Sequence, residues 1–181
     1  MTGETAKAHP GTDGADRSVR ALAIVSAELL DTIRNAQLAL EDCVDGRGGT
    51  TALNRTAELL HQARGALQIT ETYGAAMLVE EMELAARYLG SLRASMGRED
   101  GLDALTRAMV QLPAYIEGLL AGGRDIALVL LPILNDLRAA RGQPLLSEST
   151  LLLLNLSPDK GERQSVKRDG TGEDPVALIR K

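Results

Sequence analysis

His61 is the side chain in this sequence best suited to accept a transferred group, and its neighbours suggest which group. Near pH 7 a neutral imidazole is an effective nucleophile. Arg64 follows three positions later, one turn away on a helix, where a guanidinium can hold a phosphoryl oxygen. Gly65, four positions after the histidine, leaves that side of the helix without a side chain. A glycine inside a helix costs about 1 kcal/mol relative to alanine, and the close approach of another protein can offset this cost.

A carboxylate on the following helix is predicted to lie level with His61. A helical hairpin centred on Thr72 places residues that are equally far from it at the same level. His61 and Glu83 each lie eleven positions from Thr72. Glu83 could therefore accept a hydrogen bond from one ring nitrogen and leave the other nitrogen free to react. Because helix boundaries taken from a sequence are uncertain by about 2–4 residues, Glu80 and Glu81 stay as alternatives.

Each of these residues also has an ordinary structural interpretation. An exposed histidine on a helix is most often plain surface, and Arg64 would then be a solvated side chain. Gly65 would be a helix-packing contact, and Glu80-Glu81-Met82-Glu83 would be a polar helix face. Of the remaining reactive residues, Cys43 is expected to be inert and His9 to lie in a tail.

The elements that position these residues are predicted from apolar side chains that recur every three or four positions, which is typical of amphipathic helices. Short loops between such helices favour an all-α, antiparallel helical bundle of about five helices. The apolar stripes are Leu22, Val25, Leu29, Ile33, Ala36 and Leu40; Leu53, Ala57, Leu60, Ala63 and Leu67; Ala75, Leu78, Met82, Ala85, Leu89 and Leu92; and Leu105, Met109, Leu112, Ile116 and Leu119.

Caps and breakers predict where these helices begin and end. The first helix is expected to start at Ser18 as N-cap and to stop before the glycine-rich segment 45–49, and the second runs from about 50 to 70. The third closes at Gly97 with Glu80, Glu81 and Arg87 on its exposed face, and the fourth spans about 100–120.

Prolines complicate the last two predicted helices. Pro113 is expected to kink the fourth helix or to break it in two. The fifth is predicted from Asp125, as N-cap, to 141, with Pro132 interrupting it and Gly142 as its stop. The apolar run 151–156 is compatible with a strand-like or a short helical segment.

Composition bounds the function. The chain has 181 residues, a net charge of −5 and one cysteine, which argues against a nucleic-acid binder, a disulfide and a cysteine metal cluster. No stretch is long enough for a membrane span, and no metal or cofactor is expected. The predicted organisation is a disordered lead at 1–17, a helical bundle at 18–156 and a flexible linker or tail at 157–181.

The segment His61-Gln62-Ala63-Arg64-Gly65 resembles the His-x-x-Lys-Gly motif of histidine phosphotransfer (HPt) domains. Those domains are helical bundles that expose the phosphorylated histidine on the second helix of a core hairpin. In their CheA-type members a glutamate bonds the ring from the position that Glu83 holds here, 22 residues after His61. Arg64 replaces the usual lysine, which keeps the charge but changes its shape and reach. The resemblance implies that His61 is a phosphoacceptor, with Arg64, Gly65 and Glu83 as further site residues.

Longer strings resemble the N-terminal HPt-like segment of the ChpA/PilL hybrid histidine kinases. These kinases belong to the two-component chemosensory systems that control type IV pili and twitching motility, and the pilus scaffold protein FimL has a related domain. The resemblance covers about residues 19–150. Its strings are Leu67-Gln68-Ile69, Tyr73-Gly74-Ala75-Ala76, Glu80-Glu81-Met82-Glu83, Gln111-Leu112-Pro113-Ala114-Tyr115 and the stretch 131–142.

This second resemblance implies a cytoplasmic signalling domain in a chemotaxis-like phosphorelay. Its partners would be the kinase core and receiver domains of the same pathway and pilus-associated scaffold proteins, with neither nucleic acid nor direct membrane insertion. Because the 181 residues hold no kinase ATP-binding motif, the chain is expected to have no autonomous catalysis and to be a fragment of a longer histidine kinase. The alternative is a docking or scaffold domain of the FimL kind without phosphotransfer. A small enzyme has little support, since the sequence has no metal set, catalytic triad or phosphate loop.

Overall fold

The computed structural model describes residues 10–92 and 97–156, and every regular element within them is a helix. The prediction of an all-α helical bundle is confirmed. The elements in chain order are α1 (Pro10–Val44), α2 (Gly49–Ile69), α3 (Tyr73–Ser91), α4 (Arg98–Leu120), the 3-10 helix η1 (Ala127–Leu130), α5 (Leu131–Ala139) and α6 (Glu148–Leu156).

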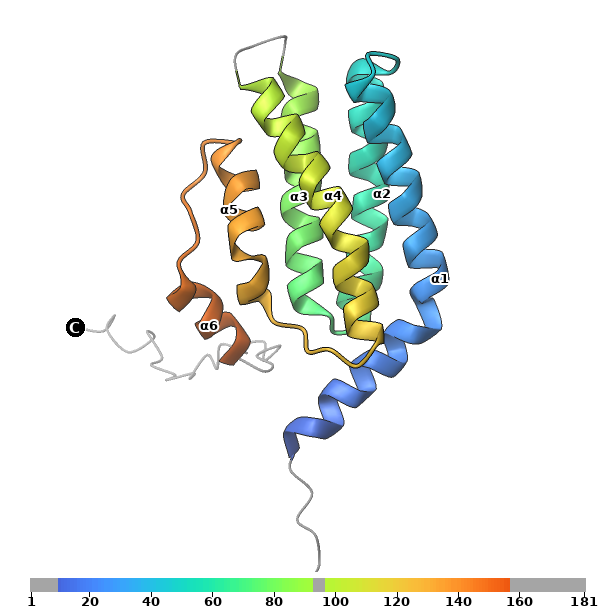
Figure 1. The fold of residues 1–181 in the computed structure, drawn as a ribbon, viewed down its shortest axis with the longest axis vertical. Helices are drawn as coiled ribbons and strands as arrows, with labels where there is room; N and C mark the ends of the chain where they lie inside the picture. The colour runs from blue at the N-terminus through green and yellow to red at the C-terminus, as the bar shows by residue number, and fades with distance from the viewer. Residues whose placement is uncertain (1–9, 93–96, 157–181) are drawn as a thin grey trace, which may run out of the picture.

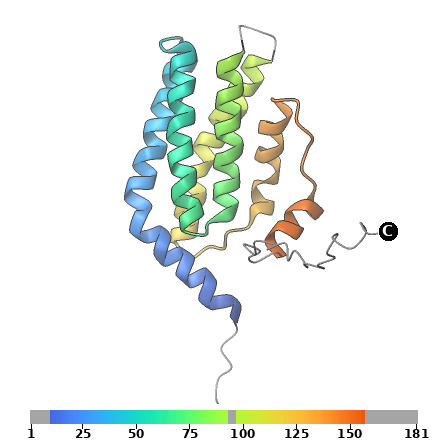
Figure 2. The same cartoon turned by 180° about the vertical axis from the view of Figure 1, so that it is seen from behind.

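Four antiparallel helices, α1 to α4, form the body of the molecule (Figures 1 and 2). Each packs on its neighbour in the chain, and α1 also contacts α4, which closes the bundle. The shorter helix α5 lies against α3 and α4, and α6 packs on η1. The N-terminal part of α1 extends past the ends of the other helices in both views.

The predicted apolar stripes form the core of this bundle. All of their members are buried except Val25 and Leu92, which are partly exposed. The largest fully buried side chains come from all four long helices and are Leu, Ile and Met. Burial of such a side chain stabilises the fold by about 1.5–3 kcal/mol. The apolar stripes therefore determine which face of α2 and of α3 is buried and which face stays exposed.

The predicted start of the first helix is wrong. Residues 10–17, expected to be part of a disordered lead, belong to α1, and the hydroxyl of Ser18 donates to the carbonyl of Gly14 at 3.1 Å instead of capping the helix. Once a helix is nucleated by its packed part, each added residue gains a hydrogen bond without a further nucleation cost. The helix therefore extends beyond the apolar pattern. The rest of that lead, 1–9, and the predicted tail, 157–181, lie outside the described residues.

The two prolines act differently from each other. α4 continues as one helix through Pro113, so the predicted break into two pieces is wrong. Pro132 stands in the first turn of α5, where a residue without an N–H loses no helical hydrogen bond. The single fifth helix predicted for 125–141 is thus replaced by η1 and a shorter α5.

Asp125 does not cap the element that follows it. Its carboxylate accepts a hydrogen bond from the backbone N–H of Gly74 in the first turn of α3 at 2.7 Å, and another from the hydroxyl of Tyr115 at 2.7 Å. That hydroxyl accepts the backbone N–H of Ile126 at 2.8 Å. A carboxylate is favourable at a helix N-terminus, so Asp125 ties the α4–η1 loop to the start of α3.

The run 151–156 is helical, as part of α6, and Leu151 is fully buried in the core. The loop before it is held by Asn135 on α5, whose amide exchanges hydrogen bonds with the backbone of Leu146 at 2.8 and 3.1 Å. Among the described residues, no helix combines the length and the hydropathy that a membrane crossing requires.

Candidate functional site

His61 projects from the exposed flank of α2 toward the side of α3. Its neighbours Leu60 and Ala63 are buried in the core, whereas the imidazole is 57% exposed. Because α2 and α3 are antiparallel and joined by the short turn 70–72, the ring lies level with Glu83. The ring Nδ1 is 3.1 Å from Glu83 Oε1 and 3.3 Å from Oε2. The predicted pairing of His61 with Glu83 is confirmed. In the described structure Glu80 and Glu81 pair with arginines and not with the ring.

Glu83 is the buried centre of the cluster, with a side chain only 6% exposed. Its Oε1 also accepts Nε and Nη2 of Arg87 at 3.1 and 2.9 Å, and its Oε2 lies 3.4 Å from Nη1 of Arg64. Removing a carboxylate from water is costly unless donors replace the lost solvent. Here three side chains from two helices supply those donors.

Arg64 stands beside the ring, as the spacing predicts. Its Nη2 is 3.1 Å from His61 Nδ1, and its Nη1 lies 3.4 Å from Glu80 Oε1. Nδ1 carries either a proton or a lone pair, so it donates to Glu83 or accepts from Arg64, but not both. No hydrogen bond or ion pair within the described part of the chain engages Nε2, which carries the lone pair when the proton is on Nδ1, and the side chain as a whole is exposed.

Gly65, one helical turn after His61, has open space on its side-chain side. A Cβ built at this position has no neighbouring atom within 4 Å, so the alternative interpretation of Gly65 as a helix-packing contact is wrong. At Gly74, by contrast, a Cβ would lie 2.3 Å from Oδ1 of Asp125. Within the residues that the structure describes, no packing contact calls for glycine at position 65.

Two roles differ from those expected from the sequence. Arg87, predicted only as an exposed residue, bonds Glu83, and its place four residues after that glutamate is the signal that favours such a pair. Glu81, predicted on the same exposed face, is buried. It accepts Nη1 of Arg138 at 2.5 Å and Nη2 of Arg141, because α5 packs over that side of α3.

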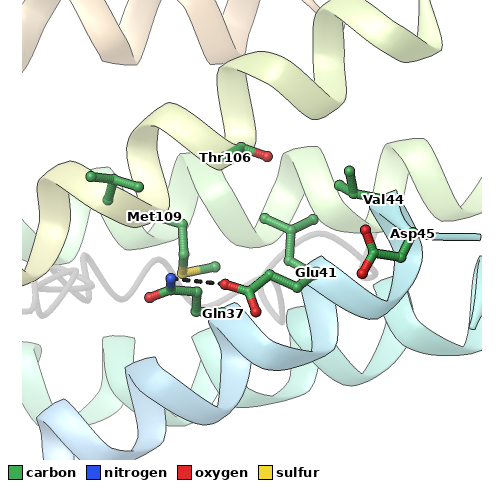
Figure 3. A pocket seen from close by; sticks show the side chains of 8 residues that line it. Gln37, Glu41, Val44, Asp45, Thr106 and Met109 are labelled. Atoms are coloured by element: carbon green, nitrogen blue, oxygen red, sulfur yellow. Dashed lines mark hydrogen bonds between the residues drawn. The ribbon is translucent and has the colours of Figure 1, made fainter. Parts of the chain in front are cut away.

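A separate cavity of about 280 Å³ lies between α1 and α4 (Figure 3). Figure 3 shows Glu41 and Gln37 of α1 joined by a hydrogen bond of 3.0 Å, with Thr106 and Met109 of α4 on the other side. The remaining lining residues are Leu40, Val44, Asp45 and Val110. The cavity contains none of the residues of the His61 cluster.

Comparison with known proteins finds one informative relative. The chain is 36% identical over 129 residues to "Scaffold protein FimL" of Pseudomonas aeruginosa, a match that covers 71% of this chain. The chain spans 23% of the length of that protein. No family model and no solved structure matches the chain. This level of identity over most of the bundle supports homology between the chain and a part of FimL.

Proposed function

We propose that this chain is a cytoplasmic signalling domain of a type IV pilus chemosensory phosphorelay, with His61 as its phosphoacceptor. Homology to FimL supports the pilus pathway. The observation that carries the phosphotransfer role is the hydrogen bond between Nδ1 of His61 and buried Glu83, beside an Nε2 without a partner in the described structure. An orienting carboxylate of this kind fixes the tautomer of a reactive imidazole.

The chemistry is a transfer in two steps, both of which depend on partner proteins. Nε2 of His61 attacks the γ-phosphorus of ATP held by a partner kinase core, the N–P bond forms, and ADP leaves with the electrons of the broken P–O bond. Glu83 retains the proton on Nδ1 and stabilises the positive charge that develops on the ring. A receiver carboxylate then attacks phosphorus and restores the neutral imidazole. Arg64 is placed to neutralise phosphoryl oxygens, and the space at Gly65 admits the partner.

A scaffold role without phosphotransfer is the second candidate. The specific observation in its favour is the similarity to FimL, which is a scaffold protein. In this alternative the His61–Glu83 contact joins α2 to α3 and has no chemical role. The two candidates differ in one measurable property, the formation of phosphohistidine at position 61.

The discriminating experiment is incubation with the kinase core of the pathway and labelled ATP, followed by mapping of acid-labile label. Phosphotransfer predicts label on the wild type and on His9→Gln, and none on His61→Gln. Glu83→Gln should label at least about tenfold more slowly, as expected when an orienting partner is lost. An active kinase core that leaves the wild type unlabelled would favour the scaffold.

A matched variant tests the docking side of the proposal. Gly65→Leu should fold normally, because no atom lies within 4 Å of a Cβ at this position, yet it should transfer phosphoryl groups poorly. Gly118→Leu, at a second open glycine on α4, is the control. Equal transfer by both variants would argue against a partner that approaches at Gly65.

A further inference from the structure

Two side chains compete for the same ring nitrogen of His61. Glu83 Oε1 and Arg64 Nη2 both lie 3.1 Å from Nδ1. When Nδ1 carries the proton, it donates to Glu83 and Nε2 holds the free lone pair. When Nδ1 carries the lone pair, it accepts from Arg64 and the proton moves to Nε2, which is then not nucleophilic. The choice between these partners therefore decides whether Nε2 or Nδ1 carries the free lone pair.

Arg87 bonds one of the two competing partners, Glu83. Its Nε and Nη2 both donate to Glu83 Oε1, the oxygen that lies nearer to Nδ1. Arg64, in contrast, is divided among Glu80, Glu83 and His61. Two donors from one planar guanidinium fix an oxygen in position better than a single flexible contact does. Without Arg87, the carboxylate would be free to turn toward Arg64, the remaining cation of the cluster.

We propose that Arg87 is a positioning residue that selects the tautomer of His61 by holding Glu83 Oε1 against Nδ1. The inference rests on the proposed function in one respect, that the Nε2 lone pair is the phosphoacceptor. The hydrogen bonds of the described residues join Arg87 to Glu83 and not to the ring. Arg87 acts only through Glu83, from the following turn of α3.

The tautomer can be measured without any phosphotransfer. The chain has only two histidines, so His9→Gln assigns the ring signals of His61 in a nitrogen NMR spectrum of labelled protein. The spectrum is recorded in the alkaline range in which the ring shifts no longer change with pH. The ring nitrogen shifts then report the ratio of the Nδ1–H form to the Nε2–H form.

In Arg87→Gln this ratio should fall about fivefold, the effect of roughly 1 kcal/mol from one lost charge-assisted interaction. Arg87→Lys, which keeps the charge but not the fork, should recover part of the ratio. Arg64→Gln should raise the ratio, because it removes the competing donor. The matched control is Arg107→Gln, which loses a similar bond to the carboxylate four residues earlier, Asp103, at 3.0 Å on α4; it should leave the ratio unchanged.

A merely structural role for Arg87 would change stability and leave the tautomer ratio alone. An unchanged or raised ratio in Arg87→Gln, with helix content intact, overturns the inference. Because Arg87 is 55% exposed, the substitution is compatible with the fold. If the ratio responds as expected but no variant accepts label from the kinase, the proposed function fails and the positioning role stands. If the wild type is labelled and Arg87→Gln changes neither the tautomer ratio nor the labelling rate, the positioning role fails and the proposed function stands.

Discussion

At the scale of single residues, Gly65 and Gly74 differ in the space that surrounds them. A Cβ at position 65 would meet open space, whereas one at position 74 would overlap the carboxylate of Asp125. Asp125 has little room to yield, since it also accepts the hydroxyl of Tyr115. Both glycines lie in helices, so their difference reflects their surroundings and not their backbone conformation.

Alanine substitutions should therefore have opposite effects on stability. Gly65→Ala is expected to raise the free energy of unfolding by about 0.5–1 kcal/mol through helix propensity alone. Gly74→Ala should lower it by about 1–2 kcal/mol, since the overlap outweighs the same gain. Urea denaturation followed by circular dichroism measures both. Changes of the same sign would mean that the difference in local space has no energetic consequence.

The sequence carried most of the information on the His61 pair. The apolar stripes show which face of each helix is buried, and the hairpin at Thr72 sets the level of Glu83, so both could be predicted. The role of Arg87 was missed because an i, i+4 pair on a polar face is usually a solvated one. Only the burial of Glu83, which depends on how α2 packs on α3, distinguishes this pair from an ordinary surface contact.

At the scale of elements, α5 is attached to α3 by a buried ion cluster. Glu81 is 8% exposed and pairs with Arg138 and Arg141, which lie 57 and 60 positions away in the chain. Such a contact cannot be predicted from local patterns, because it exists only once α5 packs over α3. For the same reason the sequence placed Asp125 at the start of its own helix and not at the start of α3.

Removal of the anion in this cluster should be costly. Glu81→Gln leaves two largely buried guanidinium groups without their counter-charge, and the free energy of unfolding should fall by about 3 kcal/mol. Glu80→Gln, at an adjacent position that is 51% exposed, should change it by less than about 0.5 kcal/mol. Denaturant titrations of the two variants provide the comparison. Equal losses would show that the cluster does not stabilise the docking of α5.

The contribution of Tyr115, which bonds the α4–η1 loop, to the free energy of unfolding should depend on pH. Burial, and next the carboxylate of Asp125, raise the pKa of its phenol well above the ordinary value. Its pKa is higher in the folded than in the unfolded chain, so its contribution is complete below the unfolded value of about 10 and is lost as the pH rises beyond it.

Tyr115→Phe should accordingly cost about 1–2 kcal/mol near neutral pH, and the difference from the wild type should shrink above about pH 10. Urea midpoints measured from neutral to alkaline pH test this expectation, with Tyr73→Phe as the control at an exposed tyrosine. A difference that stays constant with pH would mean that ionisation of Tyr115 is not linked to folding.

At the scale of the whole molecule, the bundle holds His61 of α2 level with Glu83 of α3 and leaves the imidazole exposed. Side chains of α1 to α4 form most of the core, and η1, α5 and α6 add further buried residues to it. The packing of α2 on α3 fixes their relative level, while α5 and the α4–η1 loop contact the other side of α3. The cavity between α1 and α4 lies apart from this arrangement. In the function we propose, this arrangement makes Nε2 of His61 a preferred acceptor of a phosphoryl group.

His9, the other histidine of the chain, serves as the internal reference for the reactivity of His61. Treatment with phosphoramidate, a small phosphoryl donor, followed by phosphorus NMR and peptide mapping, gives the rate and the ring nitrogen of phosphorylation at each histidine. His61 should react on Nε2, at least about tenfold faster than His9, and Glu83→Gln should remove this advantage. Equal rates at the two histidines, or phosphorylation of His61 on Nδ1, would contradict the proposed function.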